Sequence, residues 1–149
     1  MAQAFRLQLL LDLAKRRLDA ATQELYRLRN HWDEAQAKLE QLEAYQKEYD
    51  AGLGARLAEG LPAHQFNDYR LFLSKLHRAI EAQGEEVARR RRVWEEEHAR
   101  WLALRQRHKA LTVLEQRHWQ SEQAIEARRD QKQQDEFAVR VVKDNPVSR

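Results

Sequence analysis

The stretch that decides the fold runs from residue 7 to residue 53 and reads LQLLLDLAKRRLDAATQELYRLRNHWDEAQAKLEQLEAYQKEYDAGL. Its apolar residues recur at alternating steps of four and three, and only Gln46 interrupts the series. This heptad pattern predicts a coiled-coil helix, because a stripe of period 3.5 stays against its partner only when the two helices supercoil. The stripe consists of Leu7, Leu11, Ala14, Leu18, Ala21, Leu25, Leu28, Trp32, Ala35, Leu39, Leu42, Gln46, Tyr49 and Leu53.

The composition fits long helices better than a thick globular core. Charged residues make up 34% of the 149 residues, with only 4 Gly and 2 Pro. The absence of Cys excludes a disulfide framework and a thiolate metal site. A net charge of +3 permits binding to nucleic acid without predicting it. No apolar run approaches the roughly 20 residues that span a bilayer, so we expect a soluble, intracellular protein.

A short break separates the first helix from a second one. Gly52, Gly54, Gly60 and Pro62 follow the heptad stretch, with Gly60 expected to cap the first helix. We expect helices at about 4–58 and 64–140, a turn at about 59–63 and a frayed tail at 141–149. So short a connection turns the second helix back antiparallel. The prediction is all-α: one antiparallel coiled-coil hairpin over residues 1–149, monomeric, with the second helix longer.

The second helix carries its own heptad-like stripe, with a slip in register near Leu111 to Leu114. From the helix lengths, Phe5 should lie beside about residue 118, which leaves the chain from Trp119 onward without a partner helix. That overhang is almost entirely polar, so it is either frayed or held by another protein. The stripe consists of Phe66, Tyr69, Leu73, Leu76, Ile80, Gln83, Val87, Arg90, Trp94, Glu97, Trp101, Leu104, His108, Leu111, Leu114 and His118.

Motifs for catalysis and cofactor binding are absent from the sequence. There is no P-loop and no Gly-x-Ser-x-Gly elbow, and a two-helix hairpin offers no concave pocket for a catalytic group. Glu95-x-x-His98 and Glu115-x-x-His118 resemble half-sites of a di-iron bundle. They lie on one helix about 30 Å apart and cannot converge. We therefore predict no enzyme activity, no metal and no cofactor.

Two further features have competing interpretations. The run Arg89 to Arg92 could bind nucleic acid, but it is flanked by glutamates and spreads around the helix, which favours a solvated surface. Phe72 lies beside the seam and begins a second stripe with Leu76, Ala79 and Gln83. That stripe is either a docking surface or a widening of the seam.

The chain resembles the flagellar FliJ family, coiled-coil components of the flagellar type III export apparatus. The resemblance covers nearly the whole chain and depends on the order and spacing of four segments. These are the opening Phe5-Arg6-Leu7-Gln8-Leu9-Leu10-Leu11-Asp12-Leu13-Ala14, Gln41-Leu42-x-x-Tyr45-x-x-x-Tyr49, Tyr69-x-x-Phe72-Leu73-x-x-Leu76-x-x-Ala79-Ile80-x-x-Gln83, and the tail Glu126 to Arg140 with Gln134-Asp135-Glu136-Phe137-Ala138.

The resemblance implies a non-enzymatic export component similar to the central stalk of rotary ATPases. Its open end would enter the hexameric export ATPase (FliI) and promote ring assembly and ATP hydrolysis. It also implies contact with the membrane export gate protein FlhA, cooperation with export chaperones, and a cytoplasmic location at the inner membrane without insertion. Carried over to this sequence, the gate-binding residues are Phe72, Leu76, Ala79 and Gln83, and the ATPase-binding residues are Arg128, Arg129, Asp135 and Glu136.

Three alternatives stay open at this point. The chain could be a structural coiled coil that homodimerises along the same stripe. It could be the equivalent stalk protein of a virulence injectisome, or a nucleic-acid-binding hairpin that uses Arg89 to Arg92. A nucleic-acid-binding hairpin would lose affinity for DNA or RNA steeply as the salt concentration rises.

Overall fold

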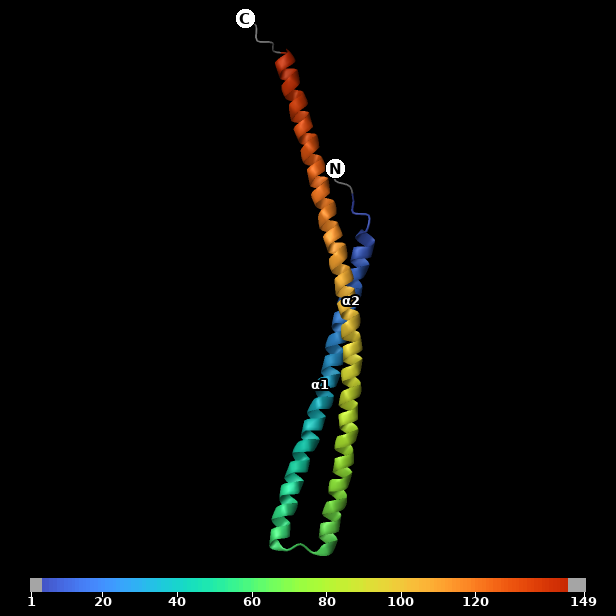
Figure 1. Ribbon diagram of the computed structural model, residues 1–149, viewed down its shortest axis with the longest axis vertical. Helices are drawn as coiled ribbons and strands as arrows, with labels where there is room; N and C mark the ends of the chain where they lie inside the picture. The colour runs from blue at the N-terminus through green and yellow to red at the C-terminus, as the bar shows by residue number, and fades with distance from the viewer. Residues whose placement is uncertain (1–3, 145–149) are drawn as a thin grey trace. The chain divides into compact units, whose positions relative to one another are not determined.

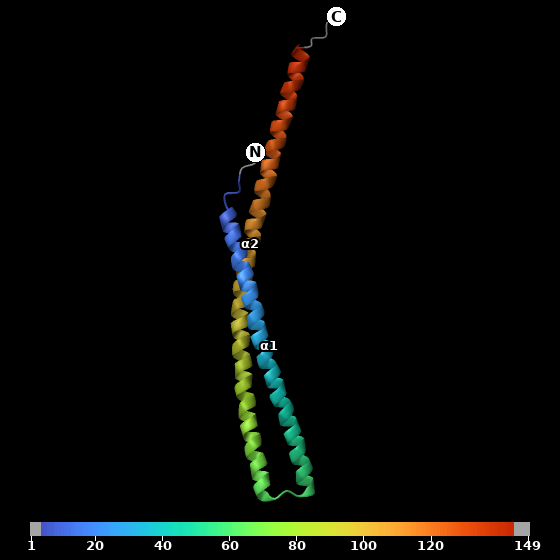
Figure 2. The ribbon, with the colours of Figure 1, turned by 180° about the vertical axis from the view of Figure 1, so that it is seen from behind.

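The computed structural model describes residues 4–144, which form two helices joined by a short turn (Figure 1). Helix α1 spans Gln8–Glu59 and helix α2 spans Ala63–Asp144. Within each of the two compact units of the chain, the backbones of α1 and α2 run side by side in opposite directions, as the view from behind also shows (Figure 2). The predicted antiparallel two-helix hairpin, with the second helix longer, is confirmed.

Residues 19–102 form one of two compact units, and they contain the turn and the larger part of the seam between the helices. Ala21 and Ala35 of α1 and Leu76 of α2 are its buried apolar residues. The rings of Trp32 and Trp94 meet across the seam, with centroids 5.5 Å apart. Each of these side chains is on a predicted heptad stripe, so the periodicity identified the seam correctly.

Polar side chains in this part of the seam bond to the backbone of the opposite helix. Gln83 donates from Nε2 to the Ala35 carbonyl at 3.0 Å, and Arg90 donates from Nη1 to the His31 carbonyl at 2.8 Å. These bonds satisfy polar side chains at seam positions, and polar residues at seam positions are known to fix register. The seam therefore has a defined register despite its polar members.

The turn depends on the conformation of Gly60. Its φ is +93°, a left-handed conformation that glycine adopts without steric cost, and its amide donates to the Leu57 carbonyl at 3.3 Å. The Pro62 carbonyl accepts a bond from the Phe66 amide at 3.0 Å, the first bond of α2. Gly60 caps α1 as predicted, and Pro62 immediately precedes the first helical residue of α2.

The second unit combines residues 1–18 with 103–149, of which 4–18 and 103–144 are described. Phe5, Leu11 and Ala14 are buried there, and the ring of Phe5 lies 5.6 Å from that of His118. The predicted pairing of Phe5 with about residue 118 is therefore confirmed. Beyond Glu122 every residue of α2 up to Asp144 is exposed, and no helix runs beside it within this unit (Figure 1).

The predicted slip in register near Leu114 is wrong. Leu114 is 42% exposed, whereas Glu115 is only partly exposed and lies with Leu111 and His118 on the side facing α1. The spacing of four and three is thus unbroken through this part of α2. Geometry prevails over hydrophobicity here, because an uninterrupted helix cannot turn Leu114 toward α1 without turning its neighbours away.

Both outer helix ends differ from the prediction. Helix α1 begins at Gln8 rather than near residue 4, because Phe5 forms a tight turn in which its carbonyl accepts the Gln8 amide at 3.2 Å. At the other end, residues 141–144 are helical rather than frayed. No proline or glycine interrupts α2 between Gly84 and Pro146, so nothing ends it earlier. The remainder of the expected tail, residues 145–149, lies outside the described residues.

Candidate interaction surfaces

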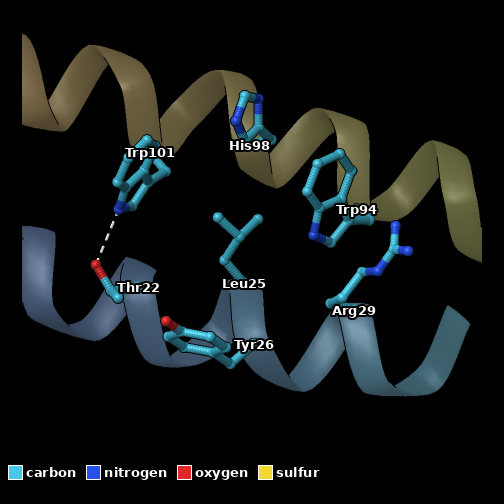
Figure 3. A pocket seen from close by; sticks show the side chains of 7 residues that line it. All are labelled: Thr22, Leu25, Tyr26, Arg29, Trp94, His98 and Trp101. Atoms are coloured by element: carbon cyan, nitrogen blue, oxygen red, sulfur yellow. Dashed lines mark hydrogen bonds between the residues drawn. The ribbon is translucent and has the colours of Figure 1, made fainter. Parts of the chain in front are cut away.

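An aromatic groove lies between the helices within the unit 19–102 (Figure 3). It encloses about 310 Å³, and Trp94, His98 and Trp101 of α2 face Leu25 of α1 across it. The imidazole of His98 stacks between the two indoles, with ring centroids 4.9 Å from Trp94 and 5.8 Å from Trp101. The lining residues are Thr22, Leu25, Tyr26, Arg29, Trp94, His98 and Trp101.

Polar groups at the edge of this groove already have partners. The indole Nε1 of Trp101 donates to Thr22 Oγ1 at 2.9 Å, shown as the dashed line in Figure 3. The guanidinium of Arg29 lies 3.9 Å from the centre of the Trp32 ring and forms an ion pair with Asp33 at 3.2 Å. Aromatic rings thus line most of the groove, and Thr22, Arg29 and Trp101 at its edge are already paired, an arrangement typical of a structural contact.

The arginine run is tied into ion pairs on its own helix. Arg89 and Arg90 both bond to Glu86, and Arg91 donates to Glu95 at 2.9 Å. The hydrogen bonds from Arg89 and Arg90 lower the pKa of Glu86 below its usual range, although burial acts in the opposite direction. Since three of the four cations have acidic partners, the run matches the solvated helix surface better than a phosphate-binding site.

The four residues assigned to gate binding do not share one exposed face. Phe72 is 42% exposed and lies against Tyr49, with ring centroids 4.6 Å apart. Ala79 is exposed, whereas Leu76 is only 8% exposed and Gln83 is bonded to α1. The ring contact between Phe72 and Tyr49 fits the interpretation in which Phe72 widens the seam, and only Ala79 and the exposed part of Phe72 are left for contact with a partner.

The four residues assigned to ATPase binding are all exposed on the part of α2 that lacks a neighbouring helix. Arg128, Arg129, Asp135 and Glu136 lie within three turns of one another. Asp135 accepts a bond from Gln131 Nε2 at 3.0 Å, a contact within the same helix. Trp119, predicted to lie beside the N-terminal end of the first helix, is exposed. Its ring meets the His118 ring edge-on, with ring centroids 4.9 Å apart.

Sequence reasoning missed the aromatic groove. Tyr26 and Arg29 lie off the α1 stripe, so the periodicity did not select them, and only the alignment of the two helices places them beside Trp94 and His98. Among residues 4–144, no group of three or more acidic or histidine side chains could hold a metal ion. Neither described helix contains a stretch apolar and long enough to cross a membrane.

The described residues define a coiled-coil hairpin whose charged side chains lie mostly on exposed helix surfaces. The family model described as "Flagellar FliJ protein" matches residues 3–146. This chain therefore belongs to the flagellar FliJ family. It is similar to the Flagellar FliJ protein of Salmonella typhi, 30% identical over 146 residues that cover 98% of this chain and 99% of the relative.

A second relative gives the same result. The Flagellar FliJ protein of Escherichia coli strain K12 is 28% identical over 146 residues, again 98% of this chain and 99% of the relative. No solved structure matches. Of the flagellar and injectisome possibilities that the sequence left open, the comparisons match the flagellar one.

Proposed function

We propose that this chain is a non-enzymatic component of flagellar protein export that acts as a helical stalk. The open end of α2 docks into the hexameric export ATPase (FliI), promotes assembly of the ring and stimulates ATP hydrolysis. The observation that carries this proposal is the exposed helix from residue 123 to Asp144, in a chain that matches its family over nearly its whole length.

The physical argument starts from the instability of a lone helix. A helix that is polar on most sides and has no neighbour is marginal in water, because most helical stability in proteins comes from packing. Entry into a ring would supply the missing neighbours. Arg128, Arg129, Asp135 and Glu136 would then make ion pairs of both signs with the inner wall of that ring.

The part of α2 next to the turn would contact the membrane export gate protein FlhA. Phe72 and Ala79 supply the exposed part of this surface, close to the turn, while Leu76 and Gln83 hold the helix beneath them in place. Export chaperones are the third class of partner in this proposal. The protein would work in the cytoplasm, on the inner face of the membrane at the flagellar base, and would bind there without insertion.

The test measures ATP hydrolysis by the cognate export ATPase with the full-length protein and with a variant in which Arg128, Arg129, Asp135 and Glu136 are all alanine. Because these side chains are exposed, the variant should fold normally and lose stimulation. The control replaces four exposed residues of matching charge on α1, namely Arg16, Arg17, Glu43 and Glu48, and should keep it. Equal stimulation by both variants would contradict docking through the end of α2.

A parallel experiment separates the gate surface from the seam. Phe72→Ala should weaken binding to the cytoplasmic part of the gate protein and leave the stimulation of the ATPase unchanged. Gln83→Ala removes the bond to the Ala35 carbonyl. This substitution should weaken gate binding only as far as it lowers the stability of the hairpin. A Phe72→Ala protein that binds the gate normally would rule out this surface.

A further inference from the structure

The exposed end of α2 has one face without charged residues. Its members recur at steps of four and three, which gives the spacing of a coiled-coil core. Every one of them is exposed. The face consists of Gln120, Ala124, Ala127, Gln131, Gln134, Ala138 and Val141.

This uncharged face is distinct from the face that continues the seam with α1. The seam positions of α2 recur at steps of three and four through Glu115, His118 and Glu122. Continued along the helix, these steps reach Ile125, Arg129, Lys132 and Glu136. Each of these residues lies about half a turn around the helix from the uncharged face. Large apolar side chains flank the uncharged face instead. Phe137 is 68% exposed and Val142 is 73% exposed, and both adjoin Ala138 or Val141.

We propose that two copies of this protein associate through this face, with the ends of their α2 helices antiparallel. A two-fold axis between the Gln131 and Gln134 levels would place Gln131 opposite Gln134 of the second copy. The same alignment places Ala127 opposite Ala138 of the second copy, and Ala124 opposite Val141 of the second copy. The small side chains let the helices approach closely, and Phe137 and Val142 cover the edges of the contact.

Charge complementarity singles out a second copy as the occupant. In this alignment the positions that flank the core bring Arg128 beside Asp135 of the second copy, and the two-fold axis repeats the pair. The contact between the two copies therefore contains two Arg–Asp ion pairs. Asp135 currently accepts a bond from Gln131, and association would release that amide to bond with Gln134 of the second copy.

The competing alignments each bring like charges together. A shift of one heptad in one direction places Arg128 opposite Arg128 and Asp130 opposite Asp130 of the second copy. A shift in the other direction places Asp135 opposite Asp135. A parallel pair would bring Asp130 beside Asp135 of the second copy. Repulsion therefore disfavours the alternatives, whereas attraction favours the proposed register.

This association joins two complete hairpins and leaves the seam between α1 and α2 intact. It uses Arg128 and Asp135, which are also assigned to the ATPase contact above, so dimerisation and ring docking exclude one another, but it can be measured without any export protein. Since the core layers are alanine and glutamine, the contact should be weak and should depend on concentration.

The first test is sedimentation equilibrium of the full-length protein over a range of concentrations. Arg128→Asp and Asp135→Arg should each raise the dimer dissociation constant about tenfold, because each turns two attractive pairs into repulsive ones. The combined variant restores opposite charges and should return to the value of the unchanged protein. Arg129→Asp is the matched control, because Arg129 points away from the contact, and should have no effect.

A second measurement tests the register. The chain has no cysteine, so single cysteines can be introduced without background. A mixture of Ala127→Cys and Ala138→Cys proteins should form the mixed disulfide faster than Ala127→Cys alone. The proposal is overturned if the protein stays monomeric to about 1 mM, or if charge reversal leaves the dimer unchanged. Faster linkage of Ala127→Cys to itself would equally overturn it.

Discussion

Replacement of Leu76 by alanine tests whether this residue belongs to the seam or to a docking surface. Leu76 is 8% exposed, and the neighbouring His77 ring lies 3.4 Å from Gln46 of α1. Buried Leu→Ala substitutions cost about 2–5 kcal/mol, and a seam of only two helices can partly close the gap. We therefore expect a loss of about 2–3 kcal/mol in the free energy of unfolding, from the lower part of that range.

The assay is thermal and urea unfolding followed by far-ultraviolet circular dichroism. For a chain of this size each kcal/mol lowers Tm by about 2–4 °C, so Leu76→Ala should lower it by roughly 4–12 °C. Leu71→Ala is the matched control on the same helix, because Leu71 is 58% exposed and should change stability by less than about 0.5 kcal/mol. Equal effects of the two substitutions would refute the placement of Leu76 in the seam.

Three further predictions concern the seam, the arginine run and the turn. Ala35→Leu should destabilise the hairpin by about 1–3 kcal/mol because Ala35 is 2% exposed, whereas Ala37→Leu on the outer surface should be neutral in the same unfolding assay. The lowered pKa of Glu86 means that its pairs stabilise the folded chain above the unfolded pKa, and this contribution is lost as pH falls through the folded value. Glu86→Gln should therefore flatten the pH dependence of urea unfolding below about pH 5, and an unchanged slope would contradict the ion pairs. Gly60→Ala should destabilise by about 1 kcal/mol because φ is positive, whereas Gly54→Ala, helical with open space around it, should stabilise by about 0.4–1 kcal/mol; melting temperatures that move in the same direction would refute this contrast.

The seam could be predicted from the sequence because it depends on periodicity alone. The heptad pattern located Ala21, Ala35 and Leu76, and the difference in helix lengths placed Phe5 beside His118. The same reasoning failed at Leu114, where hydrophobicity suggested a slip that the geometry of a continuous helix does not allow. That the whole chain acts as a single domain stays a prediction.

The surfaces were less predictable than the seam. Leu76 and Gln83 fit both the seam and the second stripe, and a one-dimensional pattern cannot assign a residue to one of two adjacent faces. The aromatic groove requires Tyr26 and Arg29 to lie beside Trp94, and that depends on the alignment of two segments far apart in the sequence. The roles assigned to Arg128 and Asp135 depend on the family resemblance and stay predictions.

The buried alanines of α1 have a consequence for how this chain folds. Ala21 and Ala35 are small, whereas α2 presents bulky rings, and the indole of Trp101 reaches across to bond with Thr22 beside Ala21. In two copies of α1 placed together, the bulky Trp32 would hold the helices apart and leave a void beside the small Ala35, and two copies of α2 would crowd their tryptophans. Each helix therefore recognises the other in preference to itself. This heterotypic recognition disfavours dimers in which two copies of α1, or two copies of α2, pair along the seam.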